Sequence, residues 1–85
     1  MTLKDVDSAL RAILSESTAV PAAEMRGEQD IISDLGLSSL ELVMVAAQIE
    51  GRLGATLEMD DVPGWTINEV AAAIHGKLTK ADGTT

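Results

Sequence analysis

Apolar residues recur at helical spacing in three segments of this 85-residue chain. The segments cover residues 3–15, 39–53 and 67–78, and in each of them apolar side chains return every three or four positions. That period is typical of helices with a buried face. Because Trp65 is the only aromatic residue, the core must consist of aliphatic side chains, which suit helix packing better than an aromatic-rich β-sandwich. We therefore expect an all-α fold.

The connections between these segments contain helix-breaking residues. Residues 17–37 include Pro21, and we expect this long segment to be pinned along the helices, with a short helical turn at residues 22–26. A second turn is expected at residues 60–62, where Pro63 would end it. These elements predict a small four-helix bundle of three main helices and one short helix.

A chain of this length forms one domain. We expect the domain to cover residues 1–85, with order over about residues 3–78 and a polar, disordered tail at residues 81–85. The initial Met1 and the polar tail favour a free-standing protein, and we expect a monomer.

The middle helix has more apolar residues than a surface helix needs. We expect its buried stripe to consist of Leu40, Val43, Ala46, Ala47 and Ile49–Leu53. We expect Leu42, Met44 and Val45 to widen that stripe.

The formal net charge of −8 at pH 7 limits the classes of partner. Nucleic acids and anionic membranes require basic surfaces, so neither is expected to bind. The charge favours partner proteins that present Lys and Arg patches. The chain has no cysteine, no signal-peptide pattern and no apolar run long enough to span a membrane. We expect it to be cytoplasmic.

Two serines stand where the middle helix begins. In the run Ser38-Ser39-Leu40-Glu41, Ser38 falls at the N-cap and Glu41 at the third helical position, which is a capping box. Ser39 then falls at the first helical position, and its hydroxyl has no capping role. The unpaired amides and the macrodipole of a helix N-terminus would stabilise a phosphate attached to that oxygen.

No catalytic group accompanies Ser39 in the sequence. His75, the only histidine, lies in the middle of the last helix, and the nucleophile-elbow pattern is absent. Any chemistry on Ser39 would therefore need another enzyme, and we do not expect the chain to be an enzyme. The acidic cluster Glu58, Asp60 and Asp61 lacks the spacing of a calcium loop, so we expect a solvated acidic face and no metal site.

The segment Asp34-Leu35-Gly36-Leu37-Ser38-Ser39-Leu40 resembles the phosphopantetheine-attachment motif of acyl carrier proteins, which usually reads D-L-G-x-D-S-L. The resemblance extends over about residues 3–78, including the helix lengths and the acidic charge. It implies that a phosphopantetheinyl transferase moves 4′-phosphopantetheine from coenzyme A to Ser39. It also implies that the arm's thiol carries an acyl group as a thioester, and that the bundle shelters an aliphatic chain.

The resemblance also implies a docking surface for partner enzymes with basic surfaces, namely a ketosynthase, an acyltransferase, and a thioesterase or ligase. The docking residues that we expect are Asp34, Leu40, Glu41, Met44 and Glu50. Met44 stands where many fatty-acid carriers have an acidic residue, so it either makes the docking surface more apolar or fills the core.

Two other departures from the family pattern affect the site. Ser38 replaces the usual Asp, which keeps a good N-cap and removes a negative charge. Trp65 is expected to fill a core position that usually holds an aliphatic residue, and the alternative is that it lines an acyl pocket.

The leading hypothesis is an acyl carrier protein in polyketide or other specialised acyl-chain biosynthesis. A peptidyl or aminoacyl carrier, such as a D-alanyl carrier, is the alternative within the same class. An acidic helical interaction module that carries nothing is the alternative from a different class.

Overall fold

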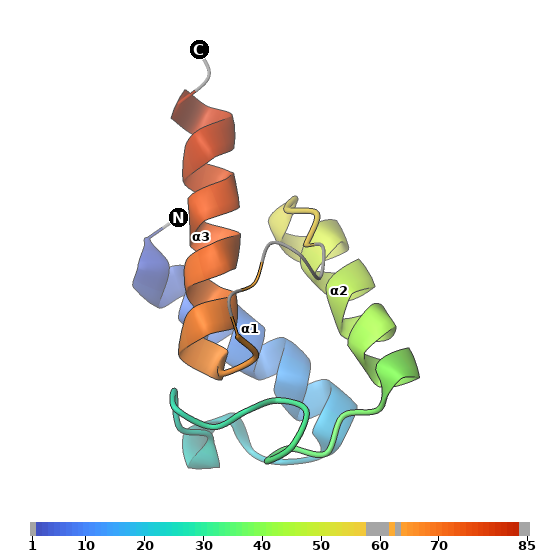
Figure 1. The fold of residues 1–85 in the computed structure, drawn as a ribbon. Helices are drawn as coiled ribbons and strands as arrows, with labels where there is room; N and C mark the ends of the chain where they lie inside the picture. Colours follow the sequence, from blue (N-terminus) through green and yellow to red (C-terminus); the bar gives the residue numbers. More distant parts are fainter. Residues whose placement is uncertain (1, 58–61, 63, 84–85) are drawn as a thin grey trace.

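The structure, a computed structural model, describes residues 2–57, 62 and 64–83, and for residues 79–83 it describes the backbone alone. The helices are α1 (Leu3–Thr18), the short 3₁₀ helix η1 (Ala22–Glu24), α2 (Ser39–Leu53) and α3 (Ile67–Gly83). Figure 1 shows α1 running toward one end of the molecule, where α2 and α3 both begin. The all-α prediction is confirmed. None of these helices combines the length and the apolar composition of a membrane span within the described residues.

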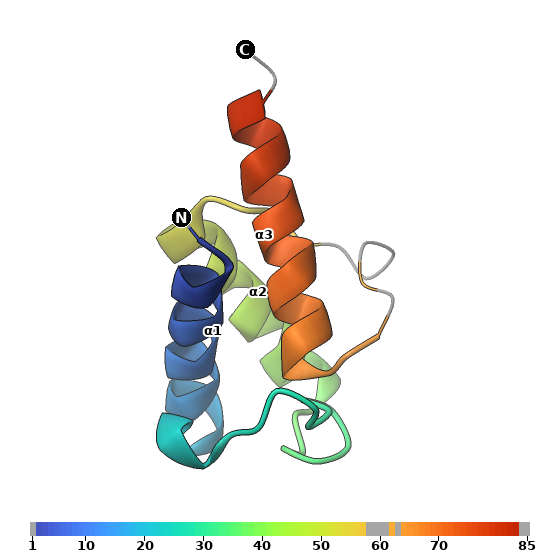
Figure 2. The same ribbon diagram turned by 90° about the vertical axis from the view of Figure 1, so that its left-hand side faces the viewer.

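Helix α1 packs against both α2 and α3, and a single aliphatic core lies between the three helices (Figure 2). Leu10 and Ile13 of α1, Ile49 of α2 and Ile74 of α3 are fully buried. The loops close the core with apolar side chains of their own, Met25, Ile31, Leu37, Ala55 and Val62.

Two helices are longer than the apolar pattern predicts. Helix α1 continues to Thr18, whose hydroxyl donates to the carbonyl of Leu14 at 2.8 Å, and it ends at Ala19 with a positive φ of 63°. Helix α3 continues to Gly83, five residues past the predicted end at residue 78. Residues 81–83 are therefore helical, which corrects the prediction of a disordered tail there. The apolar stripe marks the part of a helix that is buried, whereas backbone hydrogen bonding can continue into solvent.

The connection between α1 and α2 is anchored at several points. The Arg11 guanidinium donates to Asp7 at 2.8 Å and also to the carbonyl of Met25. The predicted turn at residues 22–26 is present as η1. An isolated antiparallel bridge joins Asp30 to Thr66 at the start of α3. The other predicted turn depends on Asp60 and Asp61, which lie outside the described residues.

Candidate functional site

The start of α2 is fixed by the capping box that the sequence predicts. The Ser38 hydroxyl accepts from the amide of Glu41 at 3.2 Å, and the Glu41 carboxylate accepts from the amide of Ser38 at 3.0 Å. This hydrogen bond from the Ser38 backbone lowers the pKa of Glu41 below its usual value. The flanking residues Leu37 and Leu42 are both buried, as expected for a hydrophobic staple.

Ser39 follows directly as the first residue of α2, and its side chain is exposed. Its hydroxyl takes no part in the cap. Within the part of the chain that the structure describes, no group accepts a hydrogen bond from the amides of Ser39 and Leu40. An exposed oxygen beside two unpaired helical amides is a favourable position for an anion.

The loop before Ser39 is held by Asp30 and Asp34. The Asp34 carboxylate accepts from the amide of Asp30 at 2.8 Å, and the amide of Asp34 donates to the carbonyl of Asp30 at 2.9 Å. Gly36 then turns the chain with a φ of +73°, a conformation that favours glycine. Asp34 and Gly36 of the sequence motif thus shape the approach to α2, and the docking role of Asp34 stays a prediction.

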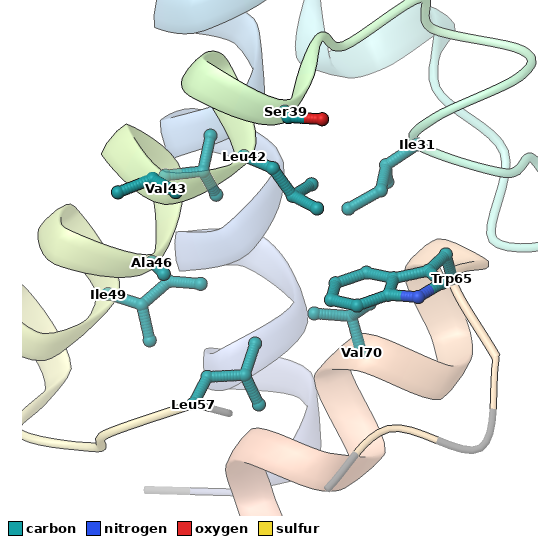
Figure 3. A pocket seen from close by; sticks show the side chains of 10 residues that line it. Ile31, Ser39, Leu42, Val43, Ala46, Ile49, Leu57, Trp65 and Val70 are labelled. Carbon is teal, nitrogen blue, oxygen red and sulfur yellow. The ribbon is translucent and has the colours of Figure 1, made fainter. Parts of the chain in front are cut away.

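A cavity of about 610 Å³ opens beside Ser39, between α2 and the start of α3 (Figure 3). Apart from the Ser39 hydroxyl and the indole of Trp65, its lining side chains are aliphatic. Those side chains are Ile31, Leu42, Val43, Val45, Ala46, Ile49, Leu57 and Val70. None of the described residues that line the cavity has a titratable side chain, so this part of the lining offers no general base for Ser39.

Trp65 both packs against the core and lines this cavity. In Figure 3 its indole lies across the cavity from α2, next to Val70. The sequence favoured a plain core position for Trp65. The structure shows that the residue also forms a cavity wall, which is the alternative that the sequence left open.

The exposed face of α2 differs from the prediction. Leu40 is 71% exposed and Val43 is 66% exposed, and Ala47 is exposed as well, so the assignment of these three residues to the buried stripe was wrong. The buried residues are Leu42, Val45 and Ile49. The staple could have indicated this face, because Leu42 must pack against Leu37 and the other two follow it at helical spacing.

Three of the four predicted docking residues on α2, Leu40, Met44 and Glu50, are exposed. Met44 is 54% exposed, which excludes the core-filling role, and Glu50 is exposed. Glu41 is half-buried. Val43 was missed as a surface residue and contributes to an apolar patch with Leu40 and Met44.

The only basic residue of α2, Arg52, is engaged by α1. Its two terminal nitrogens contact the Glu16 carboxylate at 2.7 and 3.0 Å. The same hydrogen bonds lower the pKa of Glu16. Among the described residues Glu41 and Glu50 form no ion pair, and their negative charge suits a basic partner surface.

Comparisons with known proteins agree with this geometry. A family model described as the phosphopantetheine attachment site matches residues 8–74. The acyl carrier protein of Saccharopolyspora erythraea is 30% identical to the chain over 64 residues, which cover 75% of the chain and 67% of that relative. The meromycolate extension acyl carrier protein of Mycolicibacterium smegmatis is 30% identical over 75 residues, covering 87% of the chain and 76% of the relative. The acyl carrier protein of Rhodococcus erythropolis is 27% identical over 75 residues, covering 87% and 82%.

Proposed function

The chain belongs to the acyl carrier protein family, and we propose that Ser39 is the residue to which its 4′-phosphopantetheine is attached. Members of this family carry acyl groups on phosphopantetheine and are not enzymes. The observation that supports Ser39 is its exposed hydroxyl, which stands at the first position of α2 without a capping role.

The surroundings of Ser39 fit a phosphodiester. The amides of Ser39 and Leu40 lie beside the hydroxyl, and the positive end of the α2 macrodipole favours an attached anion. The neighbouring Ser38 is less suitable, because its hydroxyl already accepts from the Glu41 amide. When bound, the phosphopantetheine arm supplies the thiol that carries an acyl group as a thioester. The apolar cavity beside Ser39 offers that acyl group a place away from water.

A transferase supplies the arm, as in the family, and none of the described lining residues could act as a base for self-loading. A phosphopantetheinyl transferase and biosynthetic enzymes are therefore the partners of this chain, as of its family. We assign docking to the exposed face of α2, with Leu40, Val43 and Met44 as apolar contacts and Glu41 and Glu50 as acidic ones. Its partners on this face are a ketosynthase, an acyltransferase, and a thioesterase or ligase with basic surfaces.

The biosynthetic setting that we propose is polyketide or other specialised acyl-chain synthesis in the cytoplasm. One relative is named a meromycolate extension acyl carrier protein. The apolar lining of the cavity is compatible with extension of an aliphatic chain as one such pathway.

Enzymatic loading tests this assignment. The purified protein is incubated with coenzyme A and a promiscuous phosphopantetheinyl transferase, and its intact mass is measured. We expect the mass to increase by one phosphopantetheine in the natural protein and not in Ser39→Ala. A mass increase that persists in Ser39→Ala would place the attachment elsewhere, and no increase with several transferases would contradict the carrier function.

A further inference from the structure

One wall of the cavity is formed by Trp65, whose backbone is held in place by hydrogen bonds of its own carbonyl and of the next residue. The carbonyl of Trp65 accepts from the amide of Ile31 at 2.8 Å. The next residue, Thr66, caps α3 by accepting from the amide of Glu69 at 3.2 Å. These contacts anchor the backbone at Trp65 without using the indole. The indole is therefore available to line the cavity.

The indole lies where a chain extending from Ser39 would pass. Figure 3 shows Ser39 at one end of the lining and Leu57 at the other, with Trp65 between them and facing α2. Across the cavity, α2 contributes Val43 and Ala46 to the lining. The indole is the largest side chain among the described lining residues, and it faces these α2 side chains across the cavity.

The chemistry of the lining restricts what can enter. Burying a carbonyl or hydroxyl without a hydrogen-bond partner is costly, and eight of the ten described lining residues are aliphatic. A buried methylene, in contrast, favours the enclosed state by about fourfold, which corresponds to ~0.8 kcal/mol. The described lining therefore favours an unsubstituted aliphatic chain over an oxygenated one.

We propose that Trp65 is a specificity-determining residue of this carrier, whose indole decides by its contact with the chain which acyl groups enter the cavity. This inference rests on the attachment of the arm to Ser39 proposed above. In the loaded carrier, the chain enters from Ser39 and contacts the indole face. An acyl group too short or too polar to enter stays in solvent and leaves the indole as it is in the unloaded protein.

The single tryptophan makes the contact directly measurable, because the chain contains no Tyr and no Phe. The protein is loaded separately with acetyl-, hexanoyl- and decanoyl-phosphopantetheine, and with a chain of decanoyl length in which carbonyls replace two methylenes. Intact mass verifies each loading. We expect the emission maximum to move to shorter wavelength and acrylamide quenching to fall from acetyl to decanoyl, with the oxygenated chain resembling acetyl.

Variants separate this role from a purely structural one. The readout is the difference in melting temperature between the decanoyl-loaded and the acetyl-loaded forms, because a chain that binds only the folded state stabilises it. We expect this difference to be lost in Trp65→Ala, retained in part in Trp65→Phe, and unchanged in Ile32→Ala, whose exposed side chain does not line the cavity. A structural role alone would lower both melting temperatures equally.

The outcomes distinguish this inference from the proposed function. Failure to load any chain on Ser39 would overturn both. Loading verified by mass, with the same emission and quenching for decanoyl and acetyl, would overturn the role of Trp65 and leave the attachment site standing. An oxygenated chain that shifts the emission as far as decanoyl does would show that the cavity at Trp65 does not discriminate between the two chains, and would overturn its role in specificity.

Discussion

Helices α2 and α3 begin with the same local hydrogen-bonding motif, but the surfaces at the two helix starts differ. Each starts with a capping box, formed by Ser38 and Glu41 in α2 and by Thr66 and Glu69 in α3. The first helical residue after the cap is the exposed Ser39 in α2. In α3 it is Ile67, which is 0% exposed.

The amides at the two helix starts also differ. In α3 the amide of Ile67 donates to the carbonyl of Gln29 at 3.0 Å, and the amide of Asn68 donates to that of Gly27 at 2.9 Å. The equivalent amides of α2 have no such acceptor among the described residues. The loop between α1 and α2 thus occupies the N-terminus of α3 and leaves that of α2 open.

This difference teaches that a capping box does not itself make an attachment site. The cap defines where a helix starts, and the tertiary contacts around it decide whether the start is buried or open to a phosphate. Helix α1 extends the comparison, since Thr2 and Asp5 form a third capping box, followed by the partly exposed Leu3.

The strongest test moves the attachment serine to α1. In Ser39→Ala with Leu3→Ser, a serine follows the Thr2 cap at an exposed position. We expect complete loss of the mass increase on incubation with transferase and coenzyme A, because none of the described residues that line the cavity belongs to α1.

Leu3→Ser alone is the matched control for this experiment, and it should load as the natural protein does. Circular dichroism verifies that both variants are folded. If the double variant gains the arm, an exposed serine after any capped helix start would be sufficient for loading. The proposed difference between the start of α2 and the other helix starts would then be contradicted.

The next test concerns the buried start of α3. Ile67→Ala removes a fully buried side chain and should lower the free energy of unfolding by about 2–5 kcal/mol. Leu40→Ala changes an exposed side chain near the start of α2 and should alter it by no more than about 0.5 kcal/mol. Urea denaturation measures both. Equal losses would show that the two helix starts are buried to a similar degree in solution.

A smaller effect is expected from the cap itself. Ser38→Ala should lower the free energy of unfolding by about 1 kcal/mol, because the amide of Glu41 loses its acceptor. The variant should still accept the arm on Ser39. Thr66→Ala is the corresponding change in α3. Loss of loading in a folded Ser38→Ala protein would mean that the transferase reads Ser38 directly.

The smallest effect is the pH dependence of the α2 cap. Because hydrogen bonding to Ser38 lowers the pKa of Glu41 below 4.5 in the folded protein, its contribution is present above about that pH. The contribution is lost as the pH falls through the lowered value. Glu41→Gln cannot titrate at this position. The difference in unfolding free energy between this variant and the natural protein should therefore be smaller at pH values below 4.5 than at neutral pH. A difference that is constant with pH would show that the Glu41 charge does not strengthen the cap.

The sequence predicts the local parts of the site well. The start of α2, its capping box and the position of Ser39 after the cap all agree with the structure. Each depends on residues three or four apart in the chain, so the relevant physics is contained in a short segment.

The tertiary structure alone decides which face of α2 is buried and what lies opposite it. Leu40 and Leu42 are equally apolar in sequence, yet one is exposed and the other buried, because only one face of the helix meets the core. The cavity beside Ser39 likewise depends on Trp65, which is 26 positions away in the sequence. The local sequence pattern therefore determines that the Ser39 hydroxyl takes no part in the helix cap. Packing between distant segments determines that an apolar cavity lies next to this hydroxyl.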